Sequence, residues 1–105
     1  MSDFVKVARL EDIPVGSVKP FDLKQQKFIV ARTDSGVFAL VNECTHDGAP
    51  ISDGKLKGDG EIMCRRHGAR FDLKSGNVTA PPALVPIDTL EVEIEGEDIL
   101  VRLED

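Results

Sequence analysis

Every cysteine and histidine of the chain lies in one of two short stretches. "NECTHDGAP", residues 42–50, places Cys44 and His46 two positions apart, and "IMCRRHGAR", residues 62–70, places Cys64 and His67 three positions apart. The chain has two cysteines and two histidines in 105 residues, so neither residue type occurs elsewhere. A fold that brings both stretches together would gather all of the chain's thiolate and imidazole metal ligands. This requirement constrains the possible folds more than any other feature of the sequence.

Short apolar runs separated by glycines and prolines predict an all-β chain. Segments 3–9, 27–32 and 36–41 are strand candidates, and "TDSG" at 33–36 suits a hairpin turn. Further strands are predicted at 61–64, on both sides of a turn at 75–77, and in a hairpin over 89–105. The sparse apolar residues of 42–60 predict one long loop. Residues 80–86, "APPALVP", predict an ordered loop because proline lacks a backbone donor.

Length and charge exclude several classes of protein. A chain of 105 residues forms one domain, 1–105. The net charge of −6 arises at residues 77–105, where Arg102 is the one basic residue against eight acidic ones. Without a basic face, nucleic acid is an improbable partner. No apolar run of about 18 residues is present to span a membrane, and no signal-like stretch begins the chain. We therefore expect a cytoplasmic protein, and nothing requires more than a monomer.

Three interpretations of the paired ligands compete. A disulfide between Cys44 and Cys64 leaves both histidines unexplained and is disfavoured in the reducing cytosol. Zinc accepts two cysteines and two histidines, although zinc fingers usually pair like with like. In the Rieske form of a [2Fe–2S] cluster, two cysteines hold one iron and two histidines hold the other. One cysteine and one histidine per loop suits that arrangement. Four unrelated side chains remain the simplest alternative.

The two stretches resemble a known pair of sequence boxes. "CTHDGAP" and "CRRHGARFD" are similar to the C-x-H and C-x2-H boxes of the Rieske family. "VARLEDIPVG" resembles the family's opening, and "GNVTAPPALVP" its proline-containing third loop. The resemblance runs along nearly the whole chain, and it points in particular to the small Rieske ferredoxins that feed electrons to oxygenases. It implies a Rieske-like antiparallel β-sandwich with a small cluster-binding subdomain. The cluster loops would lie at about 42–50 and 64–72, with a proline lid at about 79–86.

The resemblance also implies roles for individual residues. Cys44 and Cys64 would bind the iron that stays ferric, and His46 and His67 the iron that is reduced. The chain would be a one-electron carrier rather than an enzyme. It would take electrons from an NAD(P)H-dependent flavoprotein reductase and deliver them to a terminal oxygenase through transient contacts.

Four departures from the high-potential members of the family predict a low potential. Those members have two further cysteines, at positions occupied here by Ala49 and Arg66. They also have a serine and a tyrosine that hydrogen-bond sulfur, at positions occupied here by Ala69 and Phe71. Without the hydroxyl donors the reduced state is less stabilised. We therefore expect a potential toward the negative end of the Rieske range of about −150 to +300 mV.

Two other functions remain open from the sequence. The chain could be a zinc-stabilised β module that binds a partner protein, or the small Rieske subunit of a nitrite-reductase-like complex. The arginines around the second box, Arg65, Arg66 and Arg70, could form a docking rim or simply be solvated. The sequence does not identify the terminal acceptor or its substrate.

Overall fold

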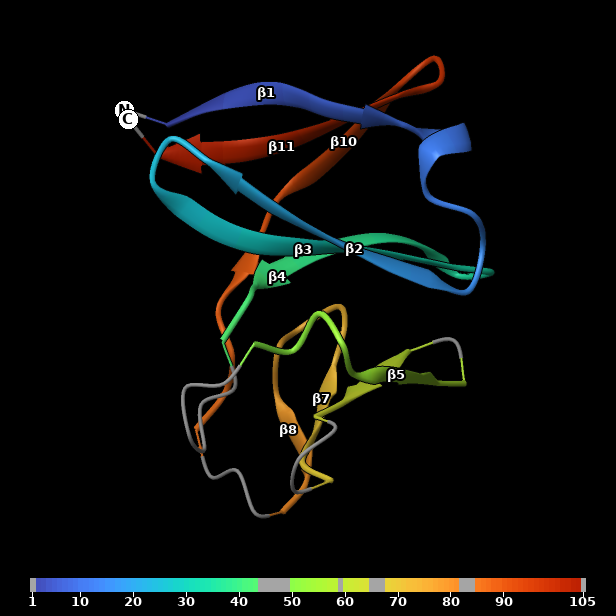
Figure 1. Cartoon of the computed structure of the whole chain (residues 1–105), viewed down its shortest axis with the longest axis vertical. Helices are drawn as coiled ribbons and strands as arrows, with labels where there is room; N and C mark the ends of the chain where they lie inside the picture. The colour runs from blue at the N-terminus through green and yellow to red at the C-terminus, as the bar shows by residue number, and fades with distance from the viewer. Residues whose placement is uncertain (1, 44–49, 59, 65–67, 82–84, 105) are drawn as a thin grey trace.

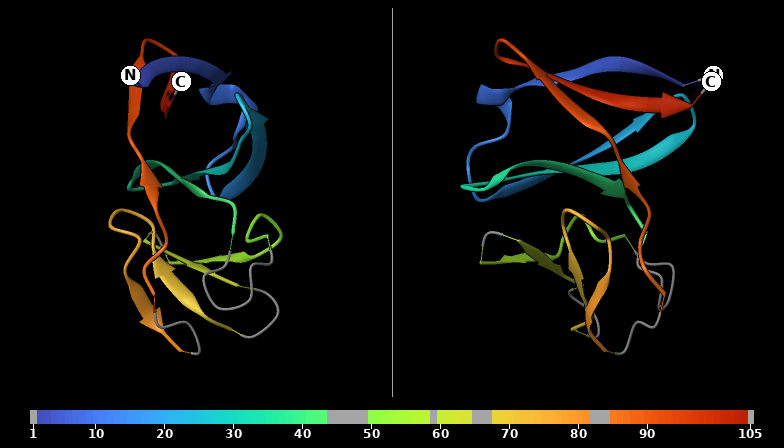
Figure 2. Two further views of the ribbon diagram at one scale, coloured as in Figure 1. Left: turned by 90° about the vertical axis from the view of Figure 1, so that its left-hand side faces the viewer. Right: turned by 180° about the vertical axis from the view of Figure 1, so that it is seen from behind.

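Three antiparallel sheets follow one another along the longest dimension of the molecule (Figures 1 and 2). The computed structural model describes residues 2–43, 50–58, 60–64, 68–81 and 85–104. The terminal sheet has the order β1 (Ser2–Arg9), β11 (Asp98–Glu104), β10 (Val92–Glu95). The middle sheet has the order β2 (Ser17–Leu23), β3 (Gln26–Thr33), β4 (Gly36–Val41), β9 (Thr89–Leu90). The distal sheet has the order β5 (Lys55–Lys57), β6 (Glu61–Met63), β7 (Arg70–Asp72), β8 (Val78–Ala80).

The middle sheet is buried on both faces, and β3 shows this most clearly. Successive side chains of a strand point to opposite faces. Phe28 and Val30 pack toward the terminal sheet, whereas Ile29 and Ala31 pack toward the distal sheet. All four side chains are fully buried. The continuous apolar run "FIVA" is therefore the sequence pattern of a strand that is covered on both sides.

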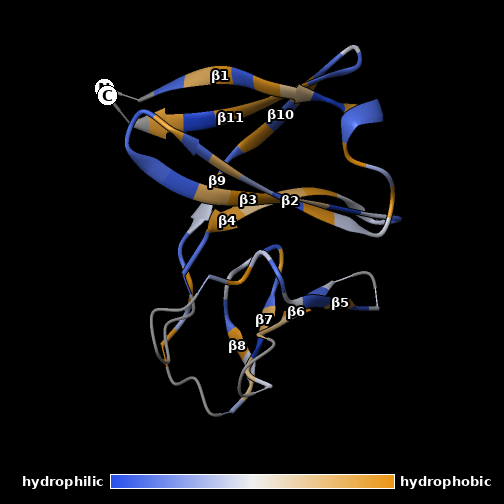
Figure 3. Ribbon diagram, viewed as in Figure 1, coloured by the Kyte–Doolittle hydropathy of each residue, from blue (hydrophilic) through white to orange (hydrophobic). Residues whose placement is uncertain are grey.

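Two hydrophobic cores result from this layering. One lies between the terminal and middle sheets and includes Ile13, Phe28, Val30, Ala39, Ile99, Val101 and Leu103. The other lies between the middle and distal sheets and includes Ile29, Leu40, Ile51, Ile62, Cys64, Phe71, Leu73 and Ile87. Each fully buried large apolar side chain contributes roughly 1.5–3 kcal/mol to folding. Figure 3 shows apolar residues along β3 and β4 of the middle sheet and, alternating with polar ones, in strands of the other two sheets.

The predicted β3–β4 hairpin is confirmed, and the predicted C-terminal hairpin is confirmed in part. Thr33 pairs with Gly36, so the turn between β3 and β4 consists of Asp34 and Ser35. The Ser35 N–H donates to the Thr33 hydroxyl oxygen at 3.0 Å, which fixes this turn. The acidic C-terminal segment forms the β10–β11 hairpin, with Glu95 opposite Asp98. The predicted hairpin over 89–105 begins too early, because Thr89 and Leu90 form β9 and pair with β4 in the middle sheet. The all-β antiparallel class is therefore the observed one.

One predicted loop and one missed strand require correction. The sequence pattern predicts an irregular segment over all of 42–60, but Lys55–Lys57 forms β5 and pairs with β6. This strand has one apolar residue, Leu56, which packs against the core between the middle and distal sheets. The pattern does not predict strand β2 either, because Pro20 interrupts it. Proline is tolerated there because β2 is an edge strand.

A single 3-10 turn, η1 (Leu10–Asp12), joins the terminal and middle sheets. The Arg32 guanidinium on β3 donates to the carbonyl oxygens of Leu10 at 2.7 Å and Ile13 at 3.3 Å, which holds this turn against the middle sheet. No described helix has the length and apolar character needed to cross a bilayer.

Candidate metal centre

The chain enters and leaves the distal part of the molecule at two adjacent points. It enters after β4, where the Asn42 N–H donates to the Lys27 carbonyl oxygen at 3.0 Å. It returns before β9, where the Asp88 carbonyl oxygen accepts from the Val41 N–H at 2.9 Å. The segment between these points, 43–87, contains both Cys/His stretches and the proline-rich stretch. The whole segment that contains the three predicted loops thus leaves and re-enters the middle sheet at adjacent points.

The second Cys/His stretch connects β6 to β7, and two backbone hydrogen bonds close its base. The Cys64 N–H donates to the Ala69 carbonyl oxygen at 2.7 Å, and the Gly68 N–H donates to the Cys64 carbonyl oxygen at 3.0 Å. Gly68 has a φ of +77°, a conformation that glycine adopts without a steric cost. Cys64 is therefore placed at the end of a strand by the β6–β7 pairing.

Cys64 lies within the core between the middle and distal sheets. Its side chain is 1% exposed, and Ile62, Ala69 and Phe71 in the same core are fully buried. Among the described residues it is a free cysteine. Ala69 and Phe71 have no hydroxyl group, so neither side chain can donate a hydrogen bond. The thiol of Cys64 therefore lies in apolar surroundings from which water is excluded.

The first Cys/His stretch is closed at its base by a side chain. The Asn42 Oδ1 atom accepts hydrogen bonds from the backbone N–H groups of Ile51 at 2.8 Å and Ser52 at 3.0 Å. The following turn is closed by the Gly54 N–H, which donates to the Ile51 carbonyl oxygen at 2.9 Å. A Cβ on Gly54 would overlap the carbonyl oxygen of Met63, the residue before Cys64. The end of the first stretch therefore packs directly on the strand that carries Cys64.

The proline-rich stretch is closed at its base by Gly76 and Ile87. The Ile87 N–H donates to the Gly76 carbonyl oxygen at 2.8 Å, and Gly76 has a φ of +78°. A Cβ on Gly76 would overlap the Ile87 carbonyl oxygen, so only glycine fits this crossing. The stretch thus begins and ends against the distal sheet.

Asp72 at the end of β7 stabilises the turn that leads into Gly76. Its Oδ2 atom accepts from both the backbone N–H and the hydroxyl of Ser75, each at 2.8 Å. The hydroxyl hydrogen bond is the main cause that lowers the pKa of the Asp72 carboxyl below its usual value of 3.8, followed by the backbone hydrogen bond. Both bonds favour the ionised carboxylate.

The structure places part of the predicted site. Of the four predicted ligands it describes Cys64, whereas Cys44, His46 and His67 lie outside the described residues. Ala49, Arg65, Arg66 and the middle of the proline lid, 82–84, also lie outside them. Arg70 is described, and its Nη1 atom lies 3.9 Å from Glu61 Oε1, so it is partly engaged within the distal sheet.

Asn42 is a residue of the site that the sequence pattern does not predict. A turn-forming residue directly before a predicted loop is a weak signal, and its partners lie nine and ten positions further along the chain.

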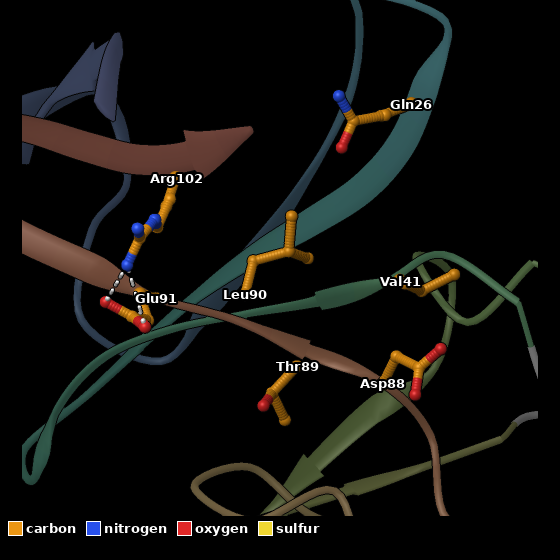
Figure 4. A pocket seen from close by; sticks show the side chains of 7 residues that line it. All are labelled: Gln26, Val41, Asp88, Thr89, Leu90, Glu91 and Arg102. Carbon is orange, nitrogen blue, oxygen red and sulfur yellow. Dashed lines mark hydrogen bonds and ion pairs between the residues drawn. The ribbon is translucent and has the colours of Figure 1, made fainter. Parts of the chain in front are cut away.

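The described residues fit an iron–sulfur site better than a pocket for an organic ligand. A buried thiol at a hairpin base suits a metal–sulfur bond, and the sequence adds one more thiol and two imidazoles within the same two stretches. A groove of about 540 Å³ lies elsewhere, where the chain crosses from β9 to β10. Its lining includes Asp88 and the paired Glu91 and Arg102, and no cysteine or histidine among the described residues (Figure 4). This groove is separate from the candidate centre.

Comparisons with known proteins agree with the fold. Residues 3–99 match the model of the Rieske [2Fe-2S] domain. The ferredoxin component of the naphthalene 1,2-dioxygenase/salicylate 5-hydroxylase systems of Ralstonia sp. is 32% identical over 102 residues, which covers 97% of each chain.

Solved structures give the same result. The ferredoxin of carbazole 1,9a-dioxygenase from Nocardioides aromaticivorans IC177 has a TM-score of 0.88 and 33% identity, with 93% of this chain and 95% of that chain covered. A chain in the complex of reduced oxygenase and oxidized ferredoxin of carbazole 1,9a-dioxygenase has a TM-score of 0.85 and 29% identity, with 93% and 91% covered.

A family defined by a [2Fe–2S] cluster accounts for the paired ligands without zinc. The fold, the apolar seat of Cys64, and the match over residues 3–99 lead to one conclusion. The chain belongs to the Rieske [2Fe–2S] domain family.

Proposed function

We propose that Cys44, His46, Cys64 and His67 hold the single Rieske cluster, with both thiolates on one iron and both imidazoles on the other. The observation that supports this assignment most directly is the buried position of Cys64. Its thiol is buried at the base of the β6–β7 hairpin, in the core to which the first stretch is also fastened through Ile51. When bound, the cluster supplies a reversible one-electron couple. The loops at 42–50 and 64–72 and the proline lid at 79–86 would then form one cluster-binding end of a single domain, 1–105.

The protein is a ferredoxin that carries single electrons and transforms no substrate. We propose that its electrons come from an NAD(P)H-dependent flavoprotein reductase and pass to a terminal oxygenase. The relative solved in complex with a reduced oxygenase supports such an acceptor here. Contacts of this kind are small and short-lived. We further propose that it works as a monomer in the cytoplasm.

The chain's own residues make the site a low-potential one. Ile62, Ala69 and Phe71 line the same core as Cys64 and exclude water from it. None of them has a hydroxyl that could donate to a sulfur and stabilise added negative charge. We therefore expect the potential in the lower part of the Rieske range.

An EPR spectrum of anaerobically purified, dithionite-reduced protein tests the assignment. We expect a rhombic spin-half signal with an average g below that of all-cysteine [2Fe–2S] proteins. The variants C44A, H46A, C64A and H67A should each lose this signal and the bound iron, whereas C64A should keep its β-sheet circular dichroism. A silent spectrum from protein that holds zinc after iron–sulfide reconstitution would overturn the proposal. So would a variant of this set that retains the unaltered signal.

A further inference from the structure

Asn42 occupies the one described point where the first Cys/His stretch is tied across its own base by a side chain. Its backbone N–H continues the β3–β4 pairing through the Lys27 carbonyl oxygen at 3.0 Å. Its side-chain oxygen turns to the other side and accepts the N–H groups of Ile51 at 2.8 Å and Ser52 at 3.0 Å. Asn42 thus connects the end of strand β4 to the residues that directly follow the first Cys/His stretch.

We propose that Asn42 is a positioning residue for the two ligands of the first loop, Cys44 and His46. This inference rests on the ligand assignment proposed above. Eight residues, 43–50, lie between Asn42 and its first partner, and both ligands are among them. Tying the ends of this segment removes conformational freedom that the ligands would otherwise lose when they bind iron.

The same hydrogen bonds link the first loop to the second. Ile51 is fully buried, and its side chain packs in the core that contains Cys64, Ile62 and Phe71. The Asn42 contact fixes the backbone of Ile51, and the Ile51 side chain is anchored in the core that contains Cys64. We therefore expect loss of the acceptor at position 42 to disturb how the first loop is held relative to Cys64.

Position 42 requires a side chain that holds an acceptor oxygen at a fixed distance from the backbone. One sp² oxygen has two lone pairs, which match the two N–H donors. Aspartate keeps that oxygen at the same distance, whereas leucine keeps the shape of the side chain and removes the acceptor. The buried N–H of Ile51 is then left without its partner. The pair N42D and N42L therefore separates the acceptor from the packing.

Thr33 provides a matched control at another turn of the same sheet. Its hydroxyl oxygen accepts the Ser35 N–H at 3.0 Å, and its side chain is buried. The change T33V removes this acceptor while retaining the shape. Because Thr33 lies at the β3–β4 turn, outside the segment 43–87, T33V changes stability without touching a ligand loop.

The experiment measures iron release from the assembled protein to a chelator, together with the EPR spectrum of the reduced form. We expect N42L to shorten the half-life of bound iron by roughly tenfold or more and to alter the g values, as loss of an outer-sphere support does in metal sites. N42D should stay within roughly threefold of wild type and T33V within about twofold, and T33V should leave the spectrum unchanged.

Each outcome decides between the two proposals. If N42L retains iron as wild type does, or N42D loses it as fast as N42L, the positioning role is wrong while the cluster assignment stands. If the wild-type protein shows no Rieske signal, the cluster assignment itself fails. Should N42L not be recovered folded, N42Q replaces it. That variant keeps the amide but moves its oxygen by one methylene, and iron retention at the wild-type level in N42Q would also overturn the positioning role.

Discussion

Gly54 and Gly60 lie in the same part of the chain but have different surroundings. A Cβ on Gly54 would meet the backbone carbonyl oxygens of Met63 and Ile51, and backbone atoms cannot move aside as a flexible side chain can. At Gly60, apart from its chain neighbours, no described atom lies within 4 Å of the position that a Cβ would occupy. Neither glycine has a positive φ, so the two positions differ in space rather than in backbone conformation. The close approach at Gly54 holds the turn after the first Cys/His stretch against Met63, the residue before Cys64.

We expect G54A to destabilise the protein by roughly 1–3 kcal/mol, because an added methyl group forces backbone to shift. It should also speed iron release, because the carbonyl that must move belongs to Met63, next to Cys64. The matched variant G60A should be neutral or slightly stabilising. Urea unfolding and chelator-driven iron loss test both variants. Equal stability of G54A and G60A would contradict the packing argument.

Asp72 makes stability depend on pH in a defined direction. Its pKa is lowered in the folded chain, mainly by the Ser75 hydroxyl, so its contribution to stability is present above the usual pKa of 3.8. This contribution is lost as the pH falls through the lowered pKa. We expect D72N to be about 1 kcal/mol less stable near neutral pH, with the difference from wild type shrinking on acidification below about pH 4. Urea unfolding of both proteins from pH 7 to pH 3 measures this difference, which should not grow toward acid.

The elements of the molecule are organised around a middle sheet that serves two cores. Local patterns were sufficient to predict β3 and β4, because a dense apolar run and a two-residue turn are properties of adjacent residues. Strands β2 and β5 could not be predicted in this way. Both are edge strands of mixed polarity, and each exists because a stronger strand lies beside it. Pairing over distance, rather than propensity, decides such segments.

The two cores give a matched test of which packing supports the candidate site. Ile62 lies in the core beside Cys64, whereas Ile99 lies in the core between the terminal and middle sheets, and both are fully buried. We expect I62V and I99V to cost a similar amount, about 0.5–1.5 kcal/mol each. Only I62V should shorten the half-life of bound iron. Thermal unfolding with chelator assays measures both effects, and faster iron loss in I99V would show that the cores are not independent.

At the scale of the whole molecule, the excess of acidic over basic side chains and the candidate site lie at opposite ends. The terminal sheet carries Glu91, Glu93 and Glu95 near β10, partly offset by ion pairs such as Arg9–Glu97 at 2.9 Å and Lys6–Asp98 at 3.2 Å. The sequence suffices to propose the four ligands, because their spacing is a local property, and of these the structure describes Cys64. It did not predict Asn42, whose role depends on where the chain returns after the loop. The excess of acidic residues can be counted in the sequence. Its position relative to the site follows only from the order of the strands in the sheets.

The pairing of Ser2 with Glu104 places the two ends of the described chain side by side on the terminal sheet (Figure 1). The distal sheet, with Cys64, lies at the other end of a molecule 37 Å long. A tether attached at either terminus would therefore extend from the terminal sheet. The proposed cluster-binding end of the molecule would stay accessible. The fold is suited to being fused to a redox enzyme or attached to an electrode through a terminus, with the cluster-binding end directed outward in both cases.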